Sequence, residues 1–333
     1  MNRAALCYFL VTVLLAPLSL AQVDHAFLWT QSAGMQDIGT LPGWQTSLGD
    51  AISGKGTIAG YDSNTISQVT AFRWTKMTGS QRIRSLGSLP AVANGVNNLG
   101  QVVGHFVAAD STVHAYVWSA AAGLQDLGNF GGTRADALAI NNFGQVVGYS
   151  TTPSGAAQAF LWTQNGGLQD LGTLPGGTSS TAIAINDFGD IVGNSSNANG
   201  VSLAVLWRSG KIRNLGKLGG VGTNAFSVGT GINKARQVVG YSTTDDGSTH
   251  AFLWTSAGGM QDLGTLSPGD DSFALGINLA GQVVGYSASG PTVRAFLWTA
   301  TNGMQDLGDL GGGFAEAFAI NDAGQVTGYS SLP

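Results

Sequence analysis

Cysteine, charge and histidine are all scarce in this 333-residue chain, and each scarcity narrows what the protein can be. The one cysteine, Cys7, lies in the first apolar stretch. The rest of the chain therefore has neither a disulfide nor a cysteine metal ligand and must be held together by packing. Charged residues make up only 10% of the chain, and the formal net charge is −5. A weakly acidic chain is poorly suited to neutralise a phosphate backbone, so we expect no nucleic-acid partner.

An apolar run, Leu6–Leu20, lies at the N-terminus behind Arg3. It is interrupted by Pro17, it is short for a membrane span, and it ends in the small-residue pattern Ser19-Leu20-Ala21. A positive start, an apolar run and such an end are typical of a cleaved signal peptide. We therefore predict that residues 1–21 are removed and that the mature chain begins at Gln22. We expect it to be secreted or periplasmic, with no membrane span.

Glycine is abundant, with 51 residues, and one unit is repeated along the chain. The Trp of a Phe-Leu-Trp type of segment recurs seven times, 44 to 47 residues apart, at Trp29, Trp74, Trp118, Trp162, Trp207, Trp254 and Trp298. A period of this size with short strands is typical of β-propeller blades. We expect each Trp to have a structural role between blades, where it would bury roughly 150–250 Å².

One unit, His250–Ser287, shows the pattern most clearly. It predicts four strands, at Ala251–Thr255, Met260–Leu266, Phe273–Asn278 and Gln282–Ser287. The turn between the last two reads Ile-Asn-x-x-Gly. Its Asn side chain can bond to the backbone two residues on, and its Gly can take a positive φ. These glycines are predicted to close hairpins and not to cradle phosphate, because no copy has the surrounding dinucleotide fingerprint.

The phase of the repeat predicts how the ring closes. Repeat units bury their faces only against neighbours, and the inner strand pair of a blade follows the outer pair of the previous one. The mature chain would begin with an outer pair at Ala26–Leu41 and end with an inner pair at Ala315–Ser330. We predict that residues 22–333 form one all-β domain, a seven-bladed β-propeller of four-stranded repeats. Its closing blade is shared by the N- and C-terminal strands.

Several linked motifs resemble a known family. The segments His25-Ala26-Phe27-Leu28-Trp29-Thr30, Met35-Gln36-Asp37 and Ile320-Asn321-x-x-Gly324-Gln325-Val326 are similar to the bacterial extracellular HAF-repeat family, over nearly the whole mature chain. The resemblance implies export and a repeat fold, and it implies no activity. The name-giving histidine is present at His25, His114 and His250, and the other copies have Thr70, Gln158, Leu203 and Arg294.

The repeated histidines and aspartates are candidate metal ligands, yet both patterns favour a structural role. The three histidines occupy equivalent positions in different units and so point to different parts of the ring, whereas zinc needs its ligands around one point. One carboxylate per blade is not the cluster of about six to eight oxygens that calcium takes. A turn or strand-edge hydrogen bond explains these acids, which are Asp37, Asp126, Asp170, Asp262 and Asp306. We expect no cofactor, with calcium as an alternative that no ligand cluster supports.

Catalysis finds little support in the sequence. The chain has no Gly-x-Ser-x-Gly elbow and no Ser–His–Asp set that can be placed together. Glycoside hydrolases need two acids at a defined separation. The neighbouring acids Asp245-Asp246 and Asp270-Asp271 are adjacent in sequence and are expected to point apart. A polysaccharide-active enzyme therefore remains the second alternative for the function.

The remaining signal lies in the loops, which vary from copy to copy while the hairpin turns repeat. The loops from inner to outer pair and from blade to blade should share one face, and variable loops on a fixed scaffold are where binding is usually found. Unconstrained drift explains the variation nearly as well. Trp44 is the one Trp outside the repeated position, and an exposed ring there would stack on a sugar or anchor a protein. We predict ligand contact at Trp44 and at the acidic loop residues Asp50, Asp136, Asp245, Asp246, Asp270 and Asp271.

These observations together predict a monomeric, exported propeller that acts as a non-catalytic binding or scaffold module. Its partner would be an extracellular protein or a glycan. A carbohydrate-binding propeller is the first alternative. An aromatic platform with neutral hydrogen-bonding groups would favour sugar binding, and two carboxylates facing each other in a cleft would favour an enzyme.

Overall fold

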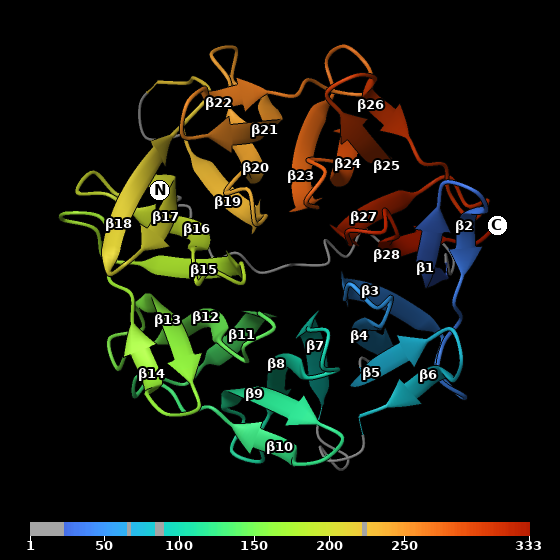
Figure 1. Cartoon of the computed structure of the whole chain (residues 1–333), viewed down its shortest axis with the longest axis horizontal. Coiled ribbons are helices and arrows are strands. Elements are labelled where there is room, and N and C mark those ends of the chain that lie inside the picture. Colours follow the sequence, from blue (N-terminus) through green and yellow to red (C-terminus); the bar gives the residue numbers. More distant parts are fainter. Residues whose placement is uncertain (1–22, 65–67, 84–89, 222–224) are drawn as a thin grey trace, which may run out of the picture.

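The computed structural model describes residues 23–64, 68–83, 90–221 and 225–333. The predicted signal segment and Gln22 lie outside these ranges. The described residues form strands, turns and loops, arranged as seven four-stranded antiparallel sheets around a common axis (Figure 1). The all-β, seven-bladed propeller predicted from the sequence is therefore confirmed. Among the described residues, no helix is long and apolar enough to cross a membrane.

Each sheet is one blade, and in six blades the four strands follow one another outward from the axis in chain order. The innermost strands are β3 (Thr46–Ile52), β7 (Ala91–Val96), β11 (Ala135–Ile140), β15 (Ser180–Ile185), β19 (Ser227–Ile232), β23 (Asp271–Ile277) and β27 (Ala315–Ile320). The second strands are β4 (Ile58–Ser63), β8 (Val102–Val107), β12 (Val146–Thr151), β16 (Ile191–Ser196), β20 (Val238–Thr243), β24 (Val283–Ser289) and β28 (Val326–Ser331).

The third strands carry the Phe-Leu-Trp type of segment. They are β5 (Val69–Thr75), β9 (Val113–Ser119), β13 (Ala157–Thr163), β17 (Ser202–Arg208), β21 (Thr249–Thr255), β25 (Thr292–Thr299) and, in the closing blade, β1 (Asp24–Thr30). The outermost strands are short: β6 (Gly79–Arg82), β10 (Gly123–Asp126), β14 (Gly167–Asp170), β18 (Lys211–Gly216), β22 (Gly259–Asp262), β26 (Gly303–Asp306) and β2 (Gly34–Asp37).

The closing blade joins the two ends of the described chain. Its strand order is β2-β1-β28-β27, so β1 pairs antiparallel with β28 from Asp24 opposite Ser331 to Trp29 opposite Val326. The hydroxyl of Thr327 also donates to the carbonyl of Phe27 at 2.9 Å. The predicted sharing of one blade by N- and C-terminal strands is confirmed, and it ties the ring without a disulfide.

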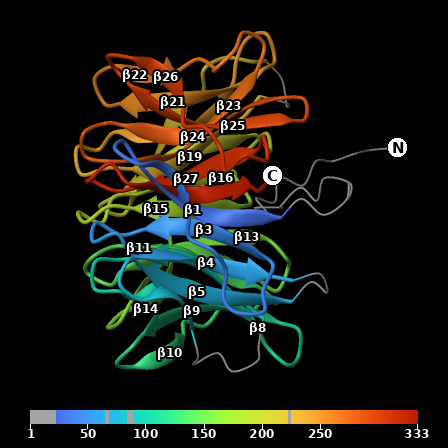
Figure 2. The same ribbon diagram turned by 90° about the vertical axis from the view of Figure 1, so that its right-hand side faces the viewer.

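Seen edge-on, the ring has two faces (Figure 2). Because the strands alternate in direction, the turns between the first and second strands and between the third and fourth strands lie on one face, which we call the turn face. The loops from the second to the third strand, and from one blade to the next, lie on the other, which we call the loop face. This arrangement agrees with the prediction that the two classes of variable loop share one face.

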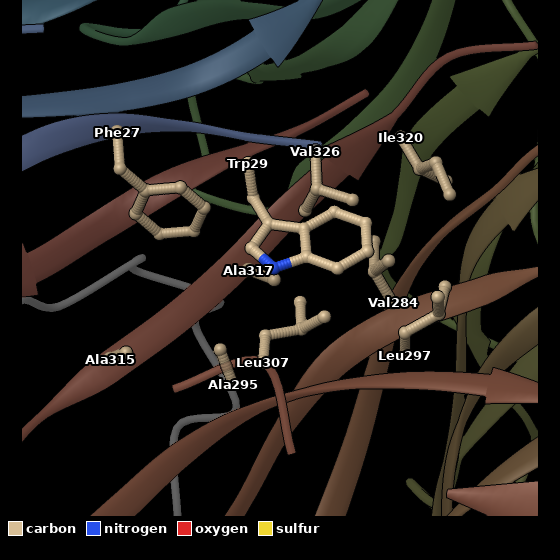
Figure 3. Packing of buried hydrophobic residues seen from close by; sticks show 10 residues of the cluster. All are labelled: Phe27, Trp29, Val284, Ala295, Leu297, Leu307, Ala315, Ala317, Ile320 and Val326. Carbon is tan, nitrogen blue, oxygen red and sulfur yellow. The ribbon is translucent and has the colours of Figure 1, made fainter. Parts of the chain in front are cut away.

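The hydrophobic core lies between blades, in seven separate clusters of buried residues. In one of them the indole of Trp29 sits between the closing blade and the neighbouring strands β24 and β25, against residues such as Val284 and Leu297 (Figure 3). Five of the seven repeated Trp side chains are buried: Trp29, Trp162, Trp207, Trp254 and Trp298. Trp74 and Trp118 are partly buried and also pack against these clusters. The predicted interblade position of the repeated Trp is confirmed.

Candidate functional site

The repeated histidines and aspartates bind each other. His25 Nδ1 lies 2.8 Å from Asp37 Oδ2, and the same contact joins His114 to Asp126 at 2.6 Å and His250 to Asp262 at 2.8 Å. In each pair the His begins the third strand and the Asp ends the fourth, 12 residues on. The other oxygen of these acids accepts an amide hydrogen from the Gly two residues on. The predicted strand-edge and turn roles are confirmed, and the fixed spacing was the signal for the pairing that sequence reasoning missed.

A belt of asparagines surrounds the axis on the turn face. In six blades the Asn that opens the turn between the first and second strands accepts the backbone amide four residues on, and in four of them also the amide two residues on, as Asn141 does from Gln145 and Phe143 at 3.0 Å each. Its Nδ2 then donates to the carbonyl of the matching residue in the next blade, at 3.0 to 3.2 Å. The donors are Asn97, Asn141, Asn186, Asn233, Asn278 and Asn321. The belt lines a cavity of about 210 Å³.

Bulky apolar side chains are exposed at the turns of three consecutive blades, and Leu279, at the second turn position of another blade, is 51% exposed and lines the cavity itself. Leu99, Phe143 and Phe188 occupy the third position of the turn in three consecutive blades and are 70%, 75% and 62% exposed. The same turn position in three further blades is alanine, at Ala235, Ala280 and Ala323. This ring of turns, which we call the rim, is therefore asymmetric, although its turns otherwise repeat.

Polar groups run between the two phenylalanines. The backbone amide and the side-chain amide of Asn142 donate to the carboxylate of Asp187, at 3.0 Å each, and the ammonium of Lys234 lies 2.9 Å from the same carboxylate. Burial raises the pKa of Asp187, but the hydrogen bonds from Asn142 and Lys234 outweigh burial and leave the pKa below its usual value. Asp187 is therefore held ionised between two exposed rings.

Arg236 holds an unusual backbone conformation beside this rim. It takes φ 61°, in a turn position where most blades have Gly at similar angles, such as Gly281 at 76°. Its guanidinium lies 5.1 Å from the centre of the Phe188 ring, and its Nε donates to Asp190 at 2.8 Å. A left-handed conformation is unfavourable for a bulky residue, and such strain is concentrated at functional sites. The contact holds Phe188 in place on the rim.

The predicted loop-face residues are spread over several places. Asp50 lies within β3 and Asp136 within β11, so the expectation that they belong to loops was wrong. The inner strands begin earlier than the loop pattern indicated, because a bulge adds one residue to each of them, between Gly49 and Ala51 in β3. Asp136 accepts from His105, Asn94 and Arg134, at 2.9, 2.8 and 3.2 Å.

The other four acids are held by their own surroundings. Asp245 accepts the amide of Gly220 at 3.0 Å, and Asp246 accepts the amide of Ser248 at 3.1 Å within its own turn. Asp270 is buried against Arg294 at 3.4 Å. Asp271 begins β23 and accepts the amide of Thr249 at 2.8 Å. Each of these carboxylates stabilises a loop. Their contact with a ligand stays a prediction.

Trp44 is partly buried and packs against the core cluster between the closing blade and the blade of β3 to β6. It also lines a groove of about 740 Å³ over the outer strand β6, together with Arg73, Arg82 and Trp118. The position of Trp44 is therefore compatible with a packing role as well as with contact to a ligand.

Two acidic residues of inner strands, Asp50 of β3 and Glu316 of β27, have raised pKa values. Burial raises the pKa of Glu316 to about 7, against a hydrogen bond from Tyr329, and Asp24 adds to the increase. Burial also raises the pKa of Asp50 well above its usual value, and Asp136 adds to it. The charges of both Asp50 and Glu316 act on Tyr61, whose pKa is raised chiefly by its burial.

The comparisons with known proteins extend only to the fold. No protein-family model and no curated protein match the chain. A solved structure described as TolB from Agrobacterium tumefaciens has a TM-score of 0.54 and 12% identity, and the match covers 94% of this chain and 100% of that one. The β-propeller domain of the Trilobed protease from Pyrococcus furiosus has a TM-score of 0.52 and 9% identity, with 85% and 88% covered. These similarities support the propeller architecture and carry no specific activity.

Proposed function

We propose that the chain is an exported, non-catalytic binding module whose turn face binds a carbohydrate. The observation that carries the proposal is the pair Phe143 and Phe188, exposed on neighbouring blades whose turns are joined by Asn142 and Asp187, with Lys234 of the following blade on the same carboxylate. Aromatic rings stack on the apolar faces of sugar rings, and amides, carboxylates and ammonium groups pair with hydroxyls. The variable loops of the sequence predicted binding on the opposite face, and these two rings were overlooked because they lie in turns that otherwise repeat.

Three features support a binding role for this rim. The turns are rigid, because the asparagine belt fixes each one to its neighbour. Alanine occupies the same turn position in three other blades, so the packing of the turn does not require the exposed aromatic rings. Phe188 is held by a residue in a strained conformation, Arg236. A rigid, pre-organised platform loses little conformational entropy on binding.

The experiment is a glycan-array screen of the mature chain, with and without calcium, followed by titration of the best ligand. Phe143→Ala and Phe188→Ala should each weaken binding by about 3- to 10-fold, from about 0.5–1.5 kcal/mol per stacked ring. Neither should change the melting temperature much, because Ala280 and Ala323 fit the same turn position. Met77→Ala is the matched control, since Met77 is 96% exposed on the same face but belongs to an outer turn.

An unchanged affinity in the Phe143→Ala/Phe188→Ala double variant would refute the turn-face site. If no glycan binds and a protein partner is captured whose binding depends on both rings, the ligand is a protein and not a carbohydrate. Export is part of the proposal and rests on the pattern of residues 1–21. An intact N-terminus in protein from the native host, measured by mass spectrometry, would contradict it.

The alternative of a polysaccharide-active enzyme has one observation in its favour, the carboxyl groups Asp50 and Glu316 on the loop face. Glycosidases keep one acid protonated and the other ionised by giving them different surroundings. Here burial is the main cause that raises both pKa values. The two groups thus lack the division of roles that the reaction needs. Release of reducing sugar that is lost in Glu316→Gln would favour the enzyme over the binding module.

A further inference from the structure

Three departures from the repeat meet at one place on the turn face. Asp190, Arg208 and Arg236 come from three separate segments: the inner turn and the outer hairpin of the blade β15–β18, and the inner turn of the next blade. Arg236 Nε lies 2.8 Å from Asp190 Oδ2, and Arg208 Nε lies 3.4 Å from Asp190 Oδ1. The Asp190 side chain is 4% exposed. One buried carboxylate therefore holds two guanidinium groups.

No other blade has a charged residue at any of these three positions. The position of Asp190 is Gln or Thr elsewhere, that of Arg208 is Thr or Ser, and that of Arg236 is Gly. Asp190 still accepts from the side chain of Asn186, at 3.4 Å, as Gln145 accepts from the matching Asn of its own turn. The turn thus closes in other blades without these charges, and the packing of a blade does not require the two arginines.

The backbone beside the arginines is also altered. Arg236 takes φ 61° at a position where the other six blades have Gly. Two residues, Ser209 and Gly210, join β17 to β18, whereas three residues join the corresponding strands of the other blades, and Ser209 takes φ 50°. Left-handed conformations are unfavourable for residues other than Gly and are concentrated at functional sites. Two residues in such conformations thus accompany one pair of guanidinium groups.

Both guanidinium groups are open to solvent. The side chains of Arg208 and Arg236 are 52% and 43% exposed, and each approaches Asp190 with its inner nitrogen, Nε. Their terminal nitrogens form no hydrogen bond within the described ranges. The single carboxylate balances only one of the two guanidinium charges. A fixed pair of arginines with free terminal N–H groups and an excess positive charge suits the binding of an oxyanion.

The turns of the turn face carry an excess of positive charge, although the chain as a whole has a net charge of −5. The basic residues in or bordering these turns are Lys55, Lys76, Arg208, Lys211, Lys234 and Arg236, and the acidic residues are Asp187, Asp190 and Asp322. Two of these acids are already paired with bases of the same face. A face with this charge attracts anionic ligands.

We propose that the carbohydrate of the turn face is acidic and that its carboxylate or sulfate group binds to the guanidinium groups of Arg208 and Arg236. This inference rests on the proposed carbohydrate site and names the class of sugar that it takes. The guanidinium of Arg236 lies 5.1 Å from the centre of the Phe188 ring. A sugar stacked on Phe188 therefore has its substituents beside the arginine pair. Asp190 is the positioning residue that holds both guanidinium groups.

The test compares charged and neutral oligosaccharides by isothermal titration of the mature chain. An oligomer of galacturonic acid is compared with its methyl ester, and a sulfated dextran oligomer with unmodified dextran of the same length. The titrations are made in about 0.15 M salt, where exposed charges are screened beyond about 8 Å. We expect an acidic oligomer to bind about tenfold more tightly than its neutral counterpart. The pair that shows the preference identifies the anionic group as carboxylate or sulfate.

Reversion to the residues of the repeat separates ligand contact from folding. Arg208→Thr should reduce the affinity for the acidic oligomer about tenfold and leave the affinity for the neutral oligomer unchanged. The triple variant Asp190→Gln/Arg208→Thr/Arg236→Gly should lose the preference altogether. Its melting temperature should stay equal or rise, because these residues occur in other blades and Gly relieves the left-handed turn position. Lys76→Ala removes an exposed cation of the same face on a different blade and should keep the preference.

This inference and the proposed function can fail separately. Equal affinities for acidic and neutral oligomers, both lost in the Phe143→Ala/Phe188→Ala variant, would leave the carbohydrate site standing and overturn the acidic ligand. A preference that survives in the triple variant would also overturn it. A loss in Lys76→Ala as large as in Arg208→Thr would do the same, because the attraction would then belong to the whole face. If no saccharide of either charge binds, both proposals are refuted.

Discussion

Replacing Asp62 by serine should stabilise this protein at pH 8. Asp62 is fully buried in β4, at a position where five other blades have serine: Ser150, Ser195, Ser242, Ser287 and Ser330. Ser195 shows why serine suits the position, since its hydroxyl accepts the amide of Leu174 at 2.9 Å and donates to the carbonyl of Ser179 at 3.3 Å. Asp62 accepts the amide of Leu41 at 2.6 Å with Oδ2, but its Oδ1 is buried without a partner among the described residues.

The pKa of Asp62 sets the magnitude. Burial raises it from 3.8 to about 7, although the amide of Leu41 and the charge of His25 both oppose the rise. Below 3.8 the carboxyl is protonated in both folded and unfolded chains and costs nothing. Between 3.8 and 7 only the unfolded chain ionises, so stability falls as the pH rises, and above 7 the loss is constant. At about 1.4 kcal/mol per pH unit the upper bound is about 4 kcal/mol, and we expect about 1–3 kcal/mol after relaxation around the group.

Urea unfolding of the mature chain and of Asp62→Ser, at pH 4 and pH 8, measures this difference. The variant should be more stable at pH 8, and the gain should shrink towards pH 4. Glu316 titrates in the same range but is common to both proteins and cancels. Ser195→Asp is the matched opposite, because it places a carboxyl in the equivalent pocket and should add a pH-dependent loss. A gain of the same size at both pH values, or a less stable variant at pH 8, would refute this account of Asp62.

Three further predictions concern the ring itself. Trp207→Ala should cost about 3–5 kcal/mol in unfolding free energy, because the side chain is 3% exposed between two blades. Trp44→Ala should cost less, as its ring is only partly buried, and an equal loss by calorimetry would show that Trp44 is core. Deleting Ala315–Pro333 removes β27 and β28 and leaves β1 without its partner, so cooperative melting should be lost. A deletion variant with an unchanged melting curve would mean that the closing blade is dispensable.

The architecture could be predicted because the information that determines it is repeated. Seven copies of one Trp spacing indicated the number of blades, and the phase of the strands indicated closure by β1 and β28. The roles of the Asn and Gly residues in the turns followed from local chemistry that needs no knowledge of distant residues. The contact between His25 and Asp37 joins the two strands of a single hairpin. The constant spacing of 12 residues between the His and the Asp could have predicted it.

The candidate sites could not be predicted in the same way, because they depend on departures from the repeat. Phe143 and Phe188 stand where other blades have alanine, and only the ring brings their turns to neighbouring positions on one face. Asp50 and Glu316 are separated by most of the chain, and their strands β3 and β27 become neighbours only because the ring closes. Asp50 was also assigned to a loop, since one bulge residue per inner strand is invisible in the hydrophobic pattern.

The asparagine belt has one gap, and this gap determines where the ring should yield under load. Six junctions between blades carry the side-chain bond, including the bond from Asn321 to the carbonyl of Ser53 that spans the closing blade. At the seventh junction Ser53 replaces the asparagine, its short side chain accepts only the amide of Thr57, and Oδ1 of Asn98 on the next blade is buried without a partner among the described residues. The partly buried Trp118 packs at the same junction. A propeller pulled open by force, or breathing near its melting point, should therefore part between β3–β6 and β7–β10, inside the continuous chain, while its two ends stay joined.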